Sequence, residues 1–270
     1  MLFVLRSVVL CALLSGGLPA FAAPSAEPWP LWEVYDGAST ETLDHRPWQA
    51  LLDHYLSEAS TGERLFAYSR VSVSDRELLS RYLASMAQVD PGQLNRAQQF
   101  AYWVNLYNAL TVDLILKNYP LDSIRSLGEG WFSFGPWDDE VVTVRGQALT
   151  LNDIEHRILR PGWGDPRIHY LVNCASRGCP DLPAQALDGS DNEAQLESAA
   201  RRFINQDKGL QREGRGIRVS SIYDWYAVDF GDRGGLIQHL KRYAGPHRQQ
   251  WLVAGVEVSF DYDWRLNESP

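Results

Sequence analysis

The sequence predicts a single α+β domain in which a central buried helix and several other helices pack on a mainly antiparallel sheet. Three observations lead to this fold class. The segment between Asn95 and Pro120 is apolar on nearly every face, which is typical of a helix at the centre of a core. Two amphipathic helical patterns precede it. Short alternating segments bounded by turn residues follow it, as expected for strands.

The N-terminus has the pattern of a secretory signal peptide. One positive charge precedes a short apolar stretch at 7–18, and Ala20-Phe21-Ala22 forms an A-x-A cleavage site. We therefore expect residues 1–23 to be removed and the protein to be periplasmic or secreted. The apolar stretch is too short to span a bilayer, and the mature chain should contain no membrane span. Residues 24–44 are expected to form an extended arm before the domain at 45–270.

Three helices are expected in the first half of the domain. The first starts near Pro47, with apolar residues at helical spacing: Trp48, Leu51, Leu52, Tyr55 and Leu56. The second is expected to open at Ser74, with Glu77 completing a capping box. The third is capped by Asn95 and Gln98 and ends at Tyr119-Pro120.

The third helix carries two amides, Asn105 and Asn108, three residues apart on one face. A buried amide without a partner costs about 1–3 kcal/mol, so each needs one. Either they pair with the backbone of a loop packed on the helix, or they line a pocket.

The second half alternates between strands and helices. Residues 141–144 and 148–151 predict a hairpin around Arg145-Gly146-Gln147. Asn152 and Glu155 predict a capped helix that stops at Pro161-Gly162, and Arg167–Asn173 has the alternation of a strand. The later elements are expected at 193–205 (helix), 217–220 (strand), 236–243 (helix) and 256–260 (strand).

Charge and composition limit the classes of partner. The chain has 25 Lys and Arg against 34 Asp and Glu, a formal charge of −9, and no basic run. We therefore expect no binding to nucleic acid and no attraction to anionic membranes. Ten Trp and twelve Tyr suit a core or a ligand groove.

Reactive side chains concentrate in LNDIEHRILR and DPRIHYLVNCASRGCPDL. Cysteine catalysis needs a thiolate, an imidazole and a group that orients the imidazole. Cys179, in a Gly-containing polar loop, is the expected nucleophile, with His156 or His169 as base and Glu155 as orienting acid. Candidates for binding the substrate or an oxyanion are Asn105, Asn108, Asn173 and Arg167. Pro180 lacks an N–H, so the residue after this nucleophile cannot supply an oxyanion donor.

Several alternatives use the same atoms. One alternative is that Cys174, at a strand end, is an inert buried thiol. Another is that Cys174 and Cys179 form a disulfide, which the oxidising compartment of an exported protein permits. A redox-active cysteine pair is a further alternative. C-x4-C without a second pair is a weak zinc signal, so we expect no metal and no cofactor.

Five motifs in order, YWVNLYNALT, LTLNDIEHRILR, DPRIHYLVNCASRGCPDL, IYDWYAVDFG and VSFDYDWRLN, resemble the bacterial branch of the domain-of-unknown-function family 547. The resemblance covers about residues 95–267. It implies a papain-like or transglutaminase-like α+β architecture, although a papain-like nucleophile would precede its histidine, and here both cysteines follow. The recurrent motif residues fall on Asn105, Asn108, Glu155, His156, His169, Cys174 and Cys179.

The expected function is that of an exported cysteine-dependent hydrolase acting on a peptide or a small amide-containing ligand. The alternative is an exported binding module without catalysis, in which the two cysteines are joined and the aromatic residues hold a ligand.

Overall fold

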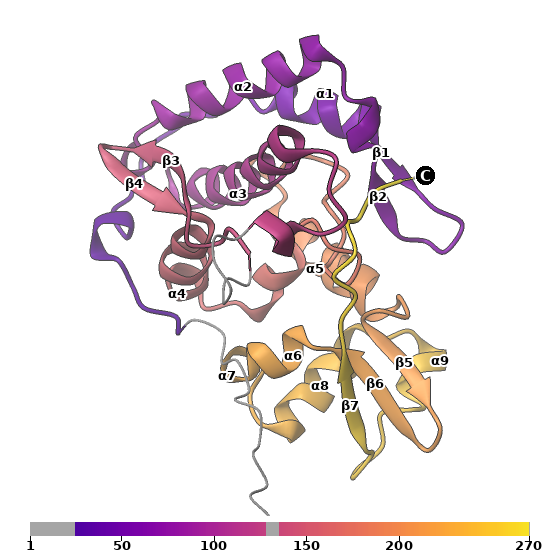
Figure 1. Cartoon of the computed structure of the whole chain (residues 1–270). Helices are drawn as coiled ribbons and strands as arrows, with labels where there is room; N and C mark the ends of the chain where they lie inside the picture. Colours follow the sequence, from indigo (N-terminus) through magenta and orange to yellow (C-terminus); the bar gives the residue numbers. More distant parts are fainter. Residues whose placement is uncertain (1–24, 128–134, 270) are drawn as a thin grey trace, which may run out of the picture.

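The computed structural model describes residues 25–127 and 135–269 (Figure 1). The protein is α+β, as the sequence predicts, with helices packed around α3 and with small sheets at the periphery. The predicted signal peptide at 1–23 lies outside the described residues.

In this part of the chain the α-helices are α1 (Arg46–Tyr55), α2 (Val73–Ala87), α3 (Arg96–Asn118), α4 (Arg160–Trp163), α5 (Asn192–Ile204), α6 (Ile222–Trp225), α7 (Ala227–Phe230), α8 (Arg233–Tyr243) and α9 (Pro246–Gln249). The strands are β1 (Leu56–Glu58), β2 (Arg64–Phe66), β3 (Glu140–Val144), β4 (Gln147–Thr150), β5 (Leu210–Glu213), β6 (Gly216–Ser220) and β7 (Val258–Asp261). Shorter helical segments are η1 (Pro30–Trp32), η2 (Tyr68–Arg70), η3 (Pro91–Gln93), η4 (Ile124–Leu127), the π-helix η5 (Asp153–Leu159) and η6 (Pro166–Tyr170).

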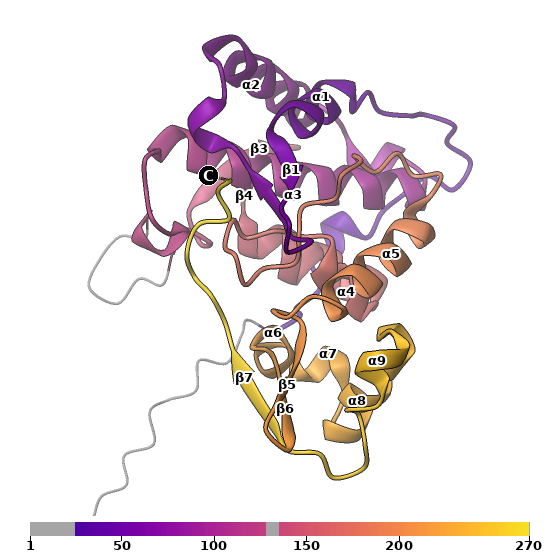
Figure 2. The same ribbon diagram turned by 90° about the vertical axis from the view of Figure 1, so that its right-hand side faces the viewer.

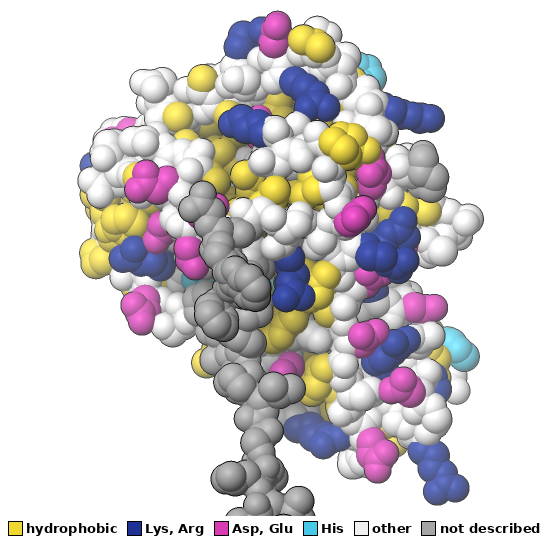
Figure 3. Space-filling model, viewed as in Figure 1, with side chains coloured by type: hydrophobic (Ala, Val, Ile, Leu, Met, Phe, Trp, Pro, Cys, Tyr) yellow, Lys and Arg dark blue, Asp and Glu magenta, His cyan; other side chains and the backbone are white. Residues whose placement is uncertain are grey.

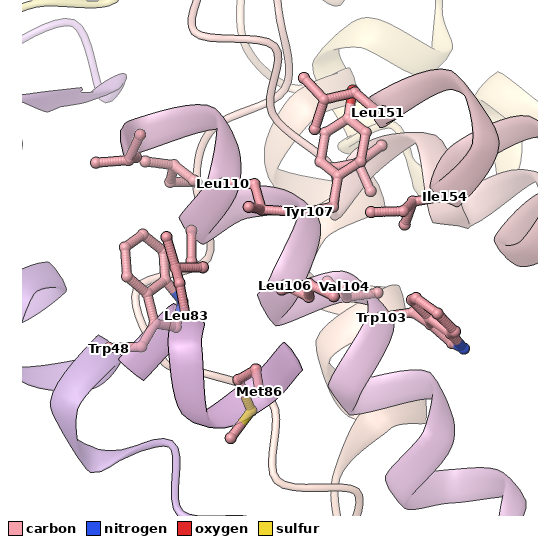
Figure 4. Packing of buried hydrophobic residues seen from close by; sticks show 14 of the residues in the cluster. Trp48, Leu83, Met86, Trp103, Val104, Leu106, Tyr107, Leu110, Leu151 and Ile154 are labelled. Carbon is pink, nitrogen blue, oxygen red and sulfur yellow. The ribbon is translucent and has the colours of Figure 1, made fainter. Parts of the chain in front are cut away.

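Helix α3 is the central buried helix that the sequence predicts. Asn95 caps it by accepting the N–H groups of Ala97 and Gln98. Figure 4 shows the packing around it: Trp48, Leu83 and Met86 come from α1 and α2 on one side, and Leu151 and Ile154 from the chain around η5 on the other. Each of these large apolar side chains contributes roughly 1.5–3 kcal/mol through burial.

A second apolar core lies below the first in Figure 1, between α5, α8 and the sheet β5-β6-β7. Its buried residues include Phe203, Val219 and Leu240. After β7 the chain runs back to the upper part, where Leu266 pairs with Ser176 and Glu268 with Phe66 (Figures 1 and 2). The C-terminal segment therefore ties the two cores together.

In the part of the chain that the structure describes, three separate small sheets replace the one sheet that we expected. The hairpin prediction is confirmed: β3 and β4 pair antiparallel around Arg145-Gly146, both in the left-handed region. β1-β2 and β5-β6 are also antiparallel, whereas β7 pairs parallel with β6. Helices α6 to α9 lie between β6 and β7 in sequence and supply the crossover that a parallel pair requires.

Four local predictions of secondary structure were wrong. Helix α2 is capped by Ser72 and not Ser74, because the Ser72 hydroxyl accepts the N–H of Asp75. Residues 167–173 form no strand. Asp165 caps the 3-10 helix η6 by accepting the N–H of Arg167. The Asp-Pro start signal of that helix outweighs the alternation of apolar residues.

The helix predicted to stop at Pro161-Gly162 continues to Trp163 and ends at the left-handed Gly164. Hydrogen bonding changes from π to α type at Arg160, so Pro161 stands in a first α-helical turn, where its missing N–H is tolerated. The Asn152 side chain does not cap the helix. The Thr150 hydroxyl accepts the N–H of Asp153 instead.

The predicted arm is packed against the domain. Within it η1 buries Trp32, whose ring meets Trp103 of α3 edge-to-face at 5.3 Å. On the face shown in Figure 3, Lys and Arg are interspersed with Asp and Glu. In 25–127 and 135–269, no helix is both long and apolar enough to cross a bilayer.

Candidate functional site

The candidate site lies where the two cores meet. Three segments contribute to it: η5 with α4, the cysteine loop (defined as residues 173–181), and α7 with the C-terminal segment that follows β7 (Figure 1). Hydrogen bonds across this junction join residues 60 or more positions apart in sequence.

The cysteine loop is fixed by its own asparagine and by the C-terminal segment. The Asn173 amide donates to the carbonyl of Pro180, and its oxygen accepts the N–H of Ala175, which has a positive φ of 59°. The N–H of Gly178 donates to the carbonyl of Asp263 at 2.8 Å. A Cβ at Gly178 would come within 2.7 Å of the Asp263 nitrogen, so only glycine permits this approach.

Cys174 is the partly exposed sulfur of the loop, and two hydroxyls lie against it. Its Sγ lies 3.0 Å from the Tyr262 hydroxyl and 3.2 Å from the Ser176 hydroxyl. The Ser176 hydroxyl donates to Tyr262 at 2.9 Å, which leaves the Tyr262 proton for the sulfur. A hydrogen bond from the thiol of Cys179, together with these hydroxyls, lowers the pKa of Cys174 to about 7 against the effect of burial.

Cys179 has the opposite character. It is buried, with 5% of its surface exposed, and its Sγ accepts the N–H of Cys174 at 2.9 Å. Burial, and then the neighbouring Cys174, raise its pKa well above the ordinary value. The expectation of an exposed Cys179 and a buried Cys174 at a strand end was wrong, because the loop turns Cys179 inward. Both cysteines are free thiols in this structure.

A buried charged cluster lies beside the loop, made of Glu155, His156, Arg160, His169 and Asp229. Asp229 Oδ2 accepts from both His169 Nε2 and Arg160 Nε at 2.7 Å. His169 Nδ1 lies 3.3 Å from Glu155 Oε1, outside hydrogen-bond geometry. Arg160 Nη1 is 3.1 Å from His156 Nδ1.

These contacts set the charge of each imidazole. Burial opposes a charge on His169, but Asp229 and Glu155 outweigh it and raise its pKa. Burial, with help from Arg160, lowers the pKa of His156 to about 4. Burial alone would raise the pKa of Glu155, but the two histidines and Arg160 hold it at about 2. The two carboxylates thus favour the protonated form of His169, whereas His156 is neutral at neutral pH.

Two tyrosines contact the charged cluster and also lie near the cysteines. The Tyr107 hydroxyl, on α3, donates to Glu155 Oε2 at 3.1 Å. Tyr226 stacks on the His169 ring with centroids 4.1 Å apart. Burial raises the pKa of both phenols, and the charges of Glu155, Cys174 and Cys179 raise it further, so both hydroxyls are within electrostatic range of the carboxylate and of the sulfurs.

The structure therefore brings the predicted residues together only in part. Glu155 and His169 are neighbours, but Glu155 does not cap a helix. Among the described residues, no hydrogen bond joins either sulfur to His156 or His169. The expected Cys-His-Glu relay is not assembled, and the hydroxyl placed to donate to the Cys174 sulfur is that of Tyr262.

The amide candidates serve the backbone. Asn105 exchanges two hydrogen bonds with the main chain of Leu187, and Asn108 binds the Leu171 carbonyl and the Asn173 N–H. This is the first of the two roles that we considered. Arg167 is paired with Asp165 and Glu193. In this conformation none of the three side chains points a free donor at Cys174.

Five residues for which no role was predicted complete the site: Tyr107, Arg160, Tyr226, Asp229 and Tyr262. All five lie within the quoted motifs, which was the available signal. Tyr262 is 88 residues from Cys174 in sequence, so local patterns do not reveal their contact. Within 25–127 and 135–269, no group of three or more His, Cys, Asp or Glu side chains is arranged to hold a metal ion.

Comparison with known proteins gives one match. Residues 91–204 match the family described as "Protein of unknown function, DUF547". This segment is a DUF547 domain. The resemblance inferred from the motifs is confirmed there, over α3, η5 and the cysteine loop, whereas the last two motifs lie beyond the match. No curated protein and no solved structure matches the chain. The papain-like or transglutaminase-like architecture therefore stays a prediction.

Proposed function

We propose that this DUF547 protein is an exported, cysteine-dependent enzyme that hydrolyses an amide, with Cys174 rather than Cys179 as its nucleophile. One observation carries the proposal: the partly exposed Cys174 sulfur has the Tyr262 and Ser176 hydroxyls as partners. Thiolates are the nucleophilic form of cysteine, and donors of this kind stabilise them without a paired imidazole. Export rests on the signal peptide pattern at residues 1–23.

The reaction proceeds in two stages. The Cys174 thiolate attacks the amide carbonyl carbon, and the C=O electron pair moves to the oxygen. The Tyr262 hydroxyl, no longer bound to a thiolate, is placed to donate to that oxyanion. The intermediate collapses, the C–N bond breaks, and the amine takes a proton from water. The hydroxide left from that water then adds to the thioester, the C–S bond breaks, and the carboxylic acid leaves as the thiolate is restored.

The charged cluster stabilises the residues next to this site. Arg160 and His169 share Asp229 of α7, and the Tyr226 ring stacks on His169. The charges of Glu155 and Asp229 favour the protonated form of His169. In this proposal Glu155 and His169 are positioning residues.

An aromatic cluster offers a surface for the substrate next to the sulfur. The Tyr262 ring packs on Trp225 at 4.7 Å and on Trp264 at 4.6 Å, and Trp137 meets Trp264 at 5.8 Å. These half-buried rings suit the side chains of a peptide or a small amide. The same cluster supports the second candidate, a binding module that does not use its thiol.

Alkylation with mass mapping tests the proposal. The mature protein would be treated with iodoacetamide from pH 5 to pH 10, and the modified cysteine identified by mass spectrometry. We expect Cys174 to react with a midpoint near pH 7 and Cys179 to stay unmodified while the protein is folded. Exclusive modification of Cys179, or no reaction in the reduced folded protein, would overturn the assignment of Cys174.

Acyl transfer needs its own measurement. We expect p-nitrophenyl acetate to acylate Cys174 in the wild type and in Cys179→Ala, and not in Cys174→Ala. Substitution of Trp225 by Ala separates the two candidates. For a binding module, a peptide ligand is lost in Trp225→Ala and retained in Cys174→Ala. For the enzyme, turnover is lost in Cys174→Ala.

A further inference from the structure

We propose that Cys174 and Cys179 form a dithiol that peroxides oxidise reversibly, with Cys174 as the attacking thiolate and Cys179 as the resolving thiol. The substrate class is a hydroperoxide or hydrogen peroxide. This activity uses the same sulfur as the proposed amide hydrolysis but does not depend on it.

The two sulfurs occupy complementary positions. Cys174 is partly exposed and has the Tyr262 and Ser176 hydroxyls beside it, so it is the sulfur that an oxidant from solvent meets first. Cys179 is buried behind it, with its Sγ against the N–H of Cys174 and 3.8 Å from the carbonyl of Val172. The buried thiol is thus shielded from solvent and still reaches its partner.

The backbone of the cysteine loop keeps this arrangement. A turn closed by the Cys179 N–H and the carbonyl of Ser176, with the left-handed Ala175 before it, brings residues five apart together. Lys208 Nζ donates to the carbonyl of Cys179 and to Asp181 Oδ1, both at 2.7 Å. Lys208 therefore fixes the part of the loop that carries Cys179, and the two sulfurs need little backbone movement to form a disulfide.

The chemistry balances with a peroxide as the oxidant. The Cys174 thiolate attacks one peroxide oxygen: an S–O bond forms, the O–O bond breaks, and the alkoxide or hydroxide leaves and takes a proton. This gives a sulfenic acid. Cys179 then attacks the Cys174 sulfur, the S–S bond forms, the S–O bond breaks, and its thiol proton leaves with the hydroxide as water. A small dithiol returns both thiols by two exchange steps.

Without Cys179 the sulfenic acid has no neighbouring thiol and goes on to the irreversible sulfinic acid. The role of Cys179 is therefore to protect Cys174 as well as to close the disulfide. This role explains why the second cysteine is buried. Its raised pKa makes it a poor nucleophile toward oxidants in solvent, and it reacts once Cys174 has become an electrophilic sulfenic acid.

The test is oxidation of the reduced mature protein with hydrogen peroxide, followed by peptide mass mapping with and without dimedone, a sulfenic acid trap. We expect the wild type to form an intramolecular Cys174–Cys179 disulfide that dithiothreitol reverses. Cys179→Ser should lose the disulfide and show the dimedone adduct and then sulfinic acid at Cys174. Cys174→Ser should leave Cys179 unoxidised. Cys179→Ala, with near-ultraviolet circular dichroism of each variant, guards against misfolding.

The inference is overturned if wild type and Cys179→Ser give the same Cys174 product, or if the disulfide forms only between molecules. Acylation of the reduced wild type by p-nitrophenyl acetate is measured separately, so failure of hydrolysis and failure of peroxide oxidation are distinguishable.

Discussion

The Tyr262 hydroxyl is one of the hydrogen-bond partners that, together with the thiol of Cys179, lower the pKa of Cys174. In Tyr262→Phe the ring stays in the aromatic cluster, but the hydroxyl 3.0 Å from Cys174 Sγ is lost. A hydrogen bond to a charged group contributes about 1.5–3 kcal/mol. One pH unit corresponds to about 1.4 kcal/mol, so we expect the pKa of Cys174 to rise by about one to two pH units. Its value would move from about 7 toward the ordinary range of a thiol.

The assay is the rate of iodoacetamide alkylation at Cys174 as a function of pH. Because a more basic thiolate is also a better nucleophile, the readout is the midpoint of the profile and not the rate at one pH. Tyr35→Phe is the control, since this tyrosine is exposed and its hydroxyl has no part in the site. An unchanged midpoint in a folded Tyr262→Phe protein would refute the reasoning that the hydroxyl stabilises the thiolate.

Three further perturbations test the frame around the sulfur. Asn108→Ala leaves two buried backbone groups unpaired, and urea unfolding should show that the free energy of unfolding falls by about 2–4 kcal/mol. Asn118→Ala, at an exposed position, should change it little. Equal losses in the two variants would show that the two hydrogen bonds of Asn108 do not stabilise the fold. Glu155 has a folded pKa of about 2 against 4.5, so its stabilisation is complete above about pH 4.5 and is lost as the pH falls toward about 2. Glu155→Gln should therefore lower stability at pH 7 and flatten the acid part of the stability profile, and an equally steep acid loss would argue against that pKa. Gly178→Ala places a Cβ 2.7 Å from a backbone nitrogen of the C-terminal segment and should raise the alkylation midpoint of Cys174, whereas Gly37→Ala meets only a contact at 3.7 Å and should not; identical midpoints in the two variants would show that the segment is not displaced.

Local sequence signals determined much of the secondary structure. The caps and the apolar run of α3, the Arg145-Gly146 hairpin and the helix at 192–204 depend on residues close in sequence, and they were predicted. The errors arose where two local signals compete. At Asp165-Pro166 a helix start outweighed an alternating pattern, and at Pro161 a change in helical hydrogen bonding tolerated a proline.

The sequence by itself also located the candidate site: Glu155, His169, Cys174 and Cys179 all lie in it. Only the tertiary structure decided what surrounds each side chain. The environment of the two thiols depends on burial and on a hydroxyl from another part of the chain, that of Tyr262, 88 residues from Cys174. Glu155 could be read locally as a cap, but its real partners come from α3 and η6, and Asp229 of α7 completes the cluster. Charge states follow from desolvation and from partners brought together by folding, and neither is written in the spacing of residues along the chain.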